Sequence, residues 1–221
     1  MSYNVLVTSA GSIIAQGIIK CLNLVNIQKK SNMHYKIITT DMSPQSAGIY
    51  RSDKGIIVPP ANSSDYIKSM IKACVENKIK ALFIGSDEEL LVLNLRKNEL
   101  ENKTGTIVIT NPTGVTEIAA DKWKTFLFLK KNRFPFTDSA LPKDADKFIE
   151  KHGFPIVVKP REGYGSLHFY VVHKKTEVVK AVKEIRRVGW RPILQEYLDG
   201  DMEFTTGVTR SNSGKIMSSI A

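Results

Sequence analysis

The sequence predicts an α/β chain in two parts: a parallel sheet flanked by helices, and then a smaller α+β unit with mainly antiparallel strands. Three observations lead to this prediction. Strand-like apolar runs alternate with helical patterns over residues 1 to about 112, as they do in βαβ units. Asn111 and Pro112 interrupt this pattern, and the proline-containing segment FPFTDSALP marks the crossover into the second part of the chain. After this crossover short strands predominate, and the turn SNSG joins the last two as an antiparallel pair.

In the first part, short apolar and β-branched runs predict strands. These runs cover residues 4–9, 35–41, 55–58, 81–85 and 106–110. Apolar residues at helical spacing predict helices between them, from Ile13 to Leu22, over residues 65–77, and in ELLVLNLR after the capping box SDEE. Strands and helices in this order predict a Rossmann-like domain over residues 1–112.

The second part begins with a helical linker over residues 113–140. One helix is predicted to end at Ala120, and the next has an apolar stripe at Trp123, Phe126, Leu127 and Leu129. Residues 141–221 form the α+β unit. Its predicted helices cover residues 143–152 and 175–187, and its predicted strands lie in FPIVVK, HFYVV, PILQEYL, EFTTGVTR and KIMSSIA.

Composition and charge narrow the class of protein. The chain has 221 residues, of which 42% are hydrophobic and 24% charged, as in a globular protein of one or two domains. No apolar run approaches the roughly 18 residues of a membrane span, and the N-terminus lacks a signal-peptide pattern, so we expect a soluble cytoplasmic protein. Cys21 and Cys74 lack metal or disulfide spacing and are expected to be core thiols. The net charge of +10 is scattered over helical segments such as 175–187, which favours a solvated surface over a nucleic-acid groove.

The turn after the first strand, TSAGSIIAQG, leaves two interpretations open. Gly11 and Gly17, with Asp41 at the end of the second strand, partly match a dinucleotide site and would suggest an NAD(P)-binding oxidoreductase, although the paired glycines of GxGxxG are lacking. Alternatively, Gly11 only closes a tight turn, and Ser12 caps the helix that follows. The segment 86–89 (SDEE) is likewise first a capping box and second a candidate for substrate contact.

The segment IVVKPREGYGSLHFYVV, residues 156–172, carries the strongest chemical signal. A strand ends with Lys159, a loop contains Gly163 and Gly165, and a second strand follows. A P-loop has its lysine after the glycines and continues into a helix, so the order here is reversed. A glycine loop between antiparallel strands can fold over a polyphosphate, because its backbone amides approach the oxygens without obstruction by side chains. The segment therefore predicts a nucleotide-binding flap.

These segments together resemble the ATP-grasp ligases, especially the carbamoyl-phosphate synthase large chains and the smaller carboxylate-amine ligases. VTSAG and TTD are similar to the pre-ATP-grasp domain of that family, and DKWKTFLFLKKN to its linker helix. VVKPREGYGS is similar to its lysine and mobile glycine loop, and LQEYLDGDMEFTTGV to its hinge strand. The order and spacing carry the resemblance: 37 residues separate Lys122 from Lys159, 37 separate Lys159 from Glu196, and 7 separate Glu196 from Glu203.

The resemblance implies an ATP site. Lys122 and Lys159 would contact the phosphates, with Lys159 also near the adenine, and the flap residues Gly163, Gly165 and Ser166 would cover them. The hinge strand would supply the rest of the site: Glu196, Tyr197 and Leu198 would line the adenine edge, and Glu203 would accept the ribose hydroxyls. The alternative for Lys122 and Glu203 is a surface charge, and for Tyr197 and Leu198 a place in the core.

The resemblance also implies an activity, in which a carboxylate attacks the γ-phosphate of ATP and an amine opens the resulting acyl phosphate. The magnesium ligands and catalytic residues of the family would lie beyond Ala221, so we expect no metal ligand within this chain and expect it to bind nucleotide without ligating. An incomplete second domain would favour a homo-oligomer or a complementing C-terminal segment. A non-catalytic nucleotide-binding module remains a third alternative.

Overall fold

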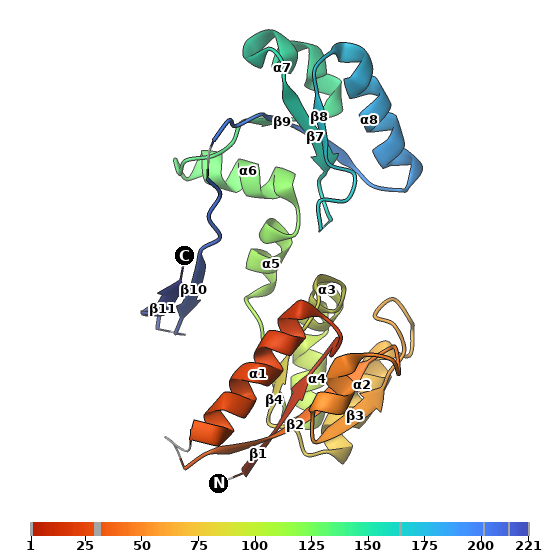
Figure 1. The fold of residues 1–221 in the computed structure, drawn as a ribbon, viewed down its shortest axis with the longest axis vertical. Coiled ribbons are helices and arrows are strands. Elements are labelled where there is room, and N and C mark those ends of the chain that lie inside the picture. The colour runs from red at the N-terminus through yellow and green to blue at the C-terminus, as the bar shows by residue number, and fades with distance from the viewer. Residues whose placement is uncertain (1, 29–31, 164, 201, 212, 221) are drawn as a thin grey trace. The chain divides into compact units, whose positions relative to one another are not determined.

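The computed structural model describes residues 2–28, 32–163, 165–200, 202–211 and 213–220. The chain divides into two compact units, Met1–Ala119 and Ala120–Ala221 (Figure 1). The division falls within the segment predicted as a helical linker. The predicted fold class, a parallel α/β sheet followed by an antiparallel sheet, is confirmed.

The first unit is built on a parallel sheet in the order β3-β2-β1-β4-β5. Its strands are β1 (Ser2–Val7), β2 (His34–Asp41), β3 (Lys54–Ile57), β4 (Ala81–Phe83) and β5 (Ile107–Ile109). Its helices are α1 (Ile13–Gln28), the short 3-10 helix η1 (Ala47–Arg51), α2 (Tyr66–Glu76), α3 (Asp87–Leu95), α4 (Lys97–Thr104) and α5 (Thr113–Ala119). The predicted strands and helices of this unit are thus present, and α4 is an addition that its polar sequence did not indicate.

Successive side chains of β1 point to opposite faces of this sheet, and helices pack against both faces. Val5 and Val7 pack in one cluster with Ile19 of α1, whereas Leu6, which points to the opposite face, packs in another with Met70 of α2 and Leu100 of α4. The strands are therefore buried on both sides, as parallel strands generally are. Their carboxyl ends are left free to carry a site.

The second unit contains an antiparallel sheet in the order β6-β9-β7-β8. Its strands are β6 (Ser139–Ala140), β7 (Ile156–Pro160), β8 (Tyr170–Val172) and β9 (Pro192–Glu196), and its helices are α6 (Lys122–Lys131), η2 (Pro142–Asp144), α7 (Ala145–His152) and α8 (Lys175–Arg187). The strands β10 (Gly207–Arg210) and β11 (Ile216–Ile220) form the separate antiparallel pair that the sequence predicts.

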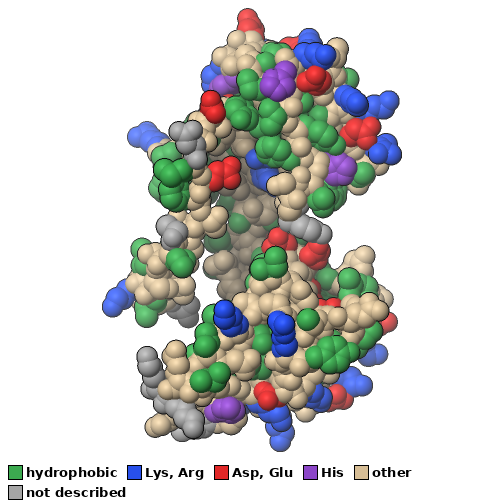
Figure 2. Space-filling model, viewed as in Figure 1, with side chains coloured by type: hydrophobic (Ala, Val, Ile, Leu, Met, Phe, Trp, Pro, Cys, Tyr) green, Lys and Arg blue, Asp and Glu red, His purple; other side chains and the backbone are tan. Residues whose placement is uncertain are grey.

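The core of the second unit lies between its sheet and the helices α7 and α8. Val178, Ala181 and Ile185 share one face of α8, and they pack against Val158 and Leu194 of the sheet. The lysines and arginines of α8 occupy its outer side, and Figure 2 shows basic side chains interspersed with acidic and apolar ones over the visible surface. Among the described residues, no helix has the length and apolar character that crossing a membrane requires.

Candidate functional site

A pocket of about 300 Å³ lies in the second unit, where the end of β7 meets the start of α6. Five of the residues predicted to contact ATP line it: Lys122, Lys159, Gly163, Gly165 and Ser166. Two neighbours complete the wall after the loop, Leu167 and Phe169. The fold therefore brings the helix that starts at Lys122 and the strand that carries Lys159 to one place, although 37 residues separate the two lysines.

The two lysines are partly buried and point to this pocket. Lys122 Nζ donates to the carbonyl oxygen of Gly163 at 3.2 Å and lies 3.4 Å from that of Arg161. Lys159 Nζ lies 5.8 Å from the centre of the Phe169 ring, a cation–π contact. Burial lowers the pKa of both lysines, and the charge of Lys122 lowers the pKa of Lys159 further. Two partly desolvated cations that repel each other are well suited to a polyanion between them.

The loop between β7 and β8 has a backbone that depends on glycine. Gly163 has a φ of 136° and Gly165 a φ of 63°, values that a side chain strongly disfavours. Ser166 and His168 follow with φ of 55° each although they carry side chains, and strain of this kind is concentrated at ligand clamps and switches. Tyr164 lies outside the described residues.

Asp121 joins the two halves of this pocket, and sequence reasoning missed it. The buried Asp121 carboxylate caps α6 by accepting from the Trp123 amide at 2.9 Å. It also accepts two hydrogen bonds from the guanidinium of Arg161, one of them from Nε at 3.1 Å. Arg191 approaches the same carboxylate at 3.4 Å and is paired with Glu162. The start of α6 is thereby tied to the glycine loop.

The ion pair keeps Asp121 charged. Burial by itself raises the pKa of the Asp121 carboxyl, but the hydrogen bonds from Arg161 and the Trp123 amide outweigh burial and leave the pKa below its ordinary value. An Asp before a helix is a recognisable capping signal. Its partner Arg161 lies 40 residues away, and no local pattern in the sequence indicates that pairing.

The other four predicted contacts do not line this pocket. Glu196, at the end of β9, is engaged elsewhere: its Oε1 accepts from the Asp138 amide at 2.6 Å, and its Oε2 lies 3.5 Å from His152 Nδ1. Tyr197 and Leu198 are 43% and 65% exposed, so the alternative that they belong to the core is wrong. Glu203 is exposed. The adenine and ribose contacts of these four residues stay predictions.

Asp138 is expected to make stability depend on pH in the acid range. Its carboxylate accepts from Lys151 Nζ at 2.6 Å and contacts His152 Nε2 at 2.8 Å. Burial alone would raise the pKa of Asp138, but these hydrogen bonds hold it below the ordinary value. Because the folded pKa is depressed, the stabilisation is present above about pH 4 and is lost as the pH falls through the folded pKa.

We therefore expect Asp138→Asn to lower the free energy of unfolding by about 1–3 kcal/mol at pH 7, and to have little effect near pH 2. Urea unfolding followed by tryptophan fluorescence measures the change, because both tryptophans, Trp123 and Trp190, lie in the second unit. Asp144→Asn is the matched control, since Asp144 is exposed and makes no capping hydrogen bond through its side chain. An equal loss of unfolding free energy at pH 7 and at pH 2 would show that the stabilisation does not depend on the ionised Asp138 carboxylate.

The dinucleotide alternative finds no support at the turn after β1. The Ala10 amide donates to Thr40 O at 3.0 Å, and the Gly11 amide donates to Asp41 Oδ2 at 2.9 Å. The Ser12 amide donates to Ser9 O at 2.8 Å. Amides of this turn would have to bind the pyrophosphate of a dinucleotide, and all three have partners within the protein.

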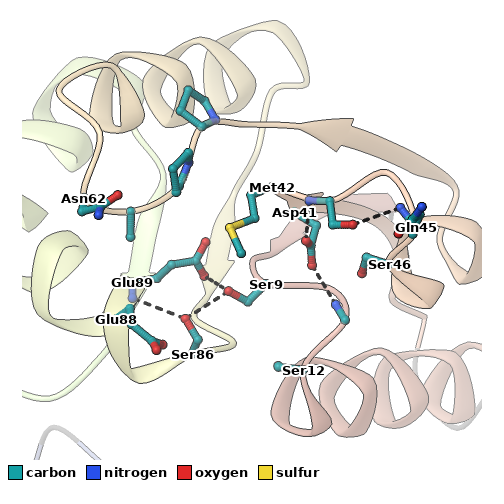
Figure 3. A pocket seen from close by; sticks show the side chains of 15 residues that line it. Ser9, Ser12, Asp41, Met42, Gln45, Ser46, Asn62, Ser86, Glu88 and Glu89 are labelled. Atoms are coloured by element: carbon teal, nitrogen blue, oxygen red, sulfur yellow. Dashed lines mark hydrogen bonds between the residues drawn. The ribbon is translucent and has the colours of Figure 1, made fainter. Parts of the chain in front are cut away.

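Both serines predicted to cap helices do so, but the capping box is confirmed only for its serine, because Glu89 Oε2 accepts from Ser9 Oγ at 2.6 Å instead of from the Ser86 amide (Figure 3). Ser12 Oγ accepts from the Ala15 amide at 3.0 Å in the first turn of α1. Ser86 Oγ accepts from the Glu89 amide at 3.3 Å at the start of α3. As for metals, no group of three or more His, Cys, Asp or Glu side chains within the described ranges is placed to hold an ion, so no magnesium ligand is assigned there.

Comparison with protein families identifies the class. Residues 5–109 match the PylC-like N-terminal domain, and residues 119–210 match the ATP-grasp domain. The chain thus contains a PylC-like N-terminal domain and an ATP-grasp domain, and the resemblance to ATP-grasp proteins seen in its sequence is confirmed. Carbamoyl phosphate synthase large chains are among its relatives. The large chain of Methanosarcina barkeri is 24% identical over 210 residues, which are 90% of this chain and 19% of the relative. The large chain of Pyrococcus furiosus is 26% identical over 172 residues, which are 74% of this chain and 16% of the relative.

Solved structures share the fold. N5-carboxyaminoimidazole synthetase from Staphylococcus aureus, complexed with ADP, has a TM-score of 0.71 at 17% identity and covers 98% of this chain and 53% of its own. The biotin carboxylase domain of the Hydrogenobacter thermophilus 2-oxoglutarate carboxylase, in complex with MgADP, has a TM-score of 0.67 at 16% identity. The match covers 88% of this chain and 44% of that domain's chain. The chain thus spans about half the length of these structures and about a fifth of the synthase chains.

Proposed function

We propose that this chain is the nucleotide-binding portion of an ATP-dependent carboxylate-amine ligase, similar to carbamoyl-phosphate synthase. The observation that carries the proposal is the convergence of Lys122 and Lys159 on one pocket beside the glycine loop. The match to the ATP-grasp domain and the ADP and MgADP complexes of structures with the same fold support ATP as the ligand. The activity proposed for residues 1–221 themselves is nucleotide binding, and ligation is proposed for the whole protein.

The residues of the pocket fit a polyphosphate. The ammonium groups of Lys122 and Lys159 would each pair with phosphate oxygens, which would offset the burial and the repulsion by Lys122 that together lower the pKa of Lys159. The loop amides of Gly163, Gly165 and Ser166 would donate to the same oxygens. In the proposal, Glu196, Tyr197 and Leu198 contact the adenine and Glu203 the ribose, so these residues would close on the nucleotide from the hinge strand.

The proposed reaction has two steps. A carboxylate oxygen of the acid substrate attacks the γ-phosphorus, and the bond between that phosphorus and ADP breaks to leave an acyl phosphate. The amine nitrogen then attacks the acyl carbon, the bond to phosphate breaks, and the nitrogen loses a proton. The lysines would stabilise charge on the transferred oxygens, where loss of one preorganised contact typically costs on the order of 3 kcal/mol, or about a hundredfold in rate. We propose that the reaction runs in the cytoplasm on magnesium-bound ATP.

Saturating ATP is expected to raise the melting temperature of the chain, and Lys159→Ala is expected to abolish the rise. At a hundred times its dissociation constant, a ligand that binds only the folded state adds about 2.7 kcal/mol of stability. Thermal unfolding followed by tryptophan fluorescence, with and without magnesium, reports on the second unit, which contains both tryptophans.

Two comparisons make this test specific. Lys183→Ala removes an exposed lysine on the outer side of α8 and should leave the ATP effect unchanged. NADPH should give no comparable rise. A rise that survives in Lys159→Ala would mean that ATP binds elsewhere, and a rise with NADPH alone would favour the oxidoreductase alternative over the ligase.

A further inference from the structure

The second unit contains another cavity, the basic pocket, with a volume of about 320 Å³. It lies where β7 ends and β9 begins, beside the end of α8 (Figure 1). Its wall is built by η2 with the residue before it, the residue after β7, the last turn of α8 and the segment that enters β9. None of the residues that line the nucleotide pocket takes part. The proposed function therefore leaves this cavity unused.

The wall of the basic pocket carries positive charge from separate parts of the chain. Lys143, Arg161, Arg186 and Arg191 line it, and no Asp or Glu is among the described residues that do so. Arg161 and Arg191 lie on neighbouring strands, since the Arg161 amide donates to the Arg191 carbonyl oxygen at 2.7 Å. A concave surface lined by charges of one sign concentrates ions of the opposite sign. The basic pocket should therefore attract anions.

Only part of this positive charge is neutralised within the protein. The two carboxylates of the network around the glycine loop, Asp121 and Glu162, pair with the two arginines next to the strands. In the described part of the chain, Lys143 and Arg186 form no ion pair. Arg187, the neighbour of Arg186, does pair with a glutamate of α8, at 2.9 Å. Two positive charges of the pocket are thus left without a partner, which suits a dianion.

Arg161 gives a second and independent sign of an anionic ligand. Its side chain is only 14% exposed, and Asp121 accepts hydrogen bonds from its Nε and Nη2 atoms. The guanidinium also carries donors on Nη1, and Nη1 has no acceptor among the described residues. A guanidinium that a buried carboxylate holds in one orientation is well placed to bind an anion through its remaining donors. An anion in the basic pocket would supply the missing acceptor.

Trp190 adds a flat apolar surface to the wall. Its ring packs edge-to-face against His168, with 5.4 Å between the ring centres. Its Cζ3 atom lies 3.9 Å from the place that a Cβ at Gly163 would take. These neighbours hold the ring on the side of the glycine loop, and Trp190 lines the basic pocket together with Pro142 and Pro192. Ligand sites commonly combine such an apolar surface with a few charged groups.

We propose that the basic pocket binds a small phosphate monoester that carries a planar apolar group. The phosphate pairs with Lys143 and Arg186 and accepts from the guanidinium of Arg161, and the planar group lies against Trp190. A phosphate monoester has a charge of about −1.5 to −2 near pH 7, which matches the two unpaired cations better than a single carboxylate does. Arginine also binds phosphate oxygens in a bidentate manner. The proposal goes beyond the ligase function and does not rest on it.

The test is a nuclear magnetic resonance titration of the ¹⁵N-labelled 221-residue chain with phenyl phosphate. The chain has two tryptophans, and Trp190→Phe identifies the indole signal of Trp190. Phenyl phosphate should shift this signal. It should bind at least about tenfold more tightly than benzoate, which has the ring but less charge, and than inorganic phosphate, which lacks the ring. The proposal is overturned if the signal does not move, or if phenyl phosphate binds no more tightly than either comparison ligand.

Two variants locate the site. Lys143→Gln and Arg186→Gln each remove one unpaired charge and should weaken phenyl phosphate binding about tenfold. Both side chains are exposed, so neither substitution should disturb folding. Arg187→Gln is the matched control, because it removes the same charge one position along α8 but outside the pocket, and its affinity should equal that of the wild type. Wild-type affinity in both pocket variants would exclude the site.

Lys159→Ala separates the basic pocket from the nucleotide pocket. This control is needed because Trp190 lies close to Gly163, which lines the nucleotide pocket. The affinity for phenyl phosphate should be unchanged in Lys159→Ala, and its loss there would mean that the ester binds in the nucleotide pocket and that the basic pocket is not a site. Conversely, if the wild-type chain binds phenyl phosphate but is not stabilised by ATP, only the proposed ligase function is overturned.

Discussion

Asp121→Ala should lower the free energy of unfolding of the second unit by about 3–5 kcal/mol, because it leaves a buried charge without its partner. The Asp121 side chain is 5% exposed and that of Arg161 is 14% exposed, so the Arg161 guanidinium that remains is poorly solvated once its partner is removed. The same substitution removes the cap of α6, which is typically worth about 1 kcal/mol. The start of α6 and the glycine loop would separate, and ATP stabilisation should fall with them.

Urea unfolding followed by tryptophan fluorescence measures this effect on the second unit alone. Asp146→Ala is the matched control, because Asp146 pairs with Lys175 at 2.8 Å but both side chains are exposed. An exposed pair contributes about 0–1 kcal/mol. The Asp121 effect should also shrink as the pH falls below about 4, because the depressed folded pKa makes the stabilisation depend on the ionised carboxylate. Similar losses for Asp121→Ala and Asp146→Ala would show that the network does not stabilise the fold.

Gly48→Ala should destabilise the first unit by about 3 kcal/mol, at the upper end of the cost of overpacking. A Cβ at Gly48 would lie 2.0 Å from the backbone oxygen of Ala10 and 2.6 Å from its carbonyl carbon. Because these are backbone atoms, a rotamer change cannot relieve the clash. The turn after β1, which contains Ala10 and Gly11, would have to move.

Hydrogen exchange of the amides in β1 and β2 reports on this change, since the first unit has no tryptophan. Gly17→Ala provides a control of opposite sign. Gly17 lies within α1, and nothing lies within 4 Å of a Cβ built there. Alanine in a helix interior is favoured over glycine by about 0.5–1 kcal/mol. If Gly48→Ala protected these amides as well as wild type, the close approach of η1 to the turn would be refuted.

The fold could be predicted because its pattern is local. Alternating apolar runs and helical stripes indicated the parallel sheet of the first unit, and the turn SNSG indicated the β10–β11 pair. Helix α4 was missed for the same reason: KNELENKT is almost wholly polar, and only Leu100 is buried. Its place is decided by packing against the first-unit core, which leaves no periodic signal in so short a segment.

The sequence by itself determined the fold class and the resemblance to ATP-grasp proteins, and it predicted five residues that line one pocket beside the glycine loop, because these features are carried by local patterns and by the order of the segments. Only the tertiary structure decided which side chains meet. It paired Asp121 with Arg161, engaged Glu196 with Asp138 and His152, and gathered Lys143 and Arg186 around the basic pocket. Such contacts join residues 40 or more positions apart. Charge and hydrogen bonding act between atoms that are close in space, and a linear pattern does not record that proximity.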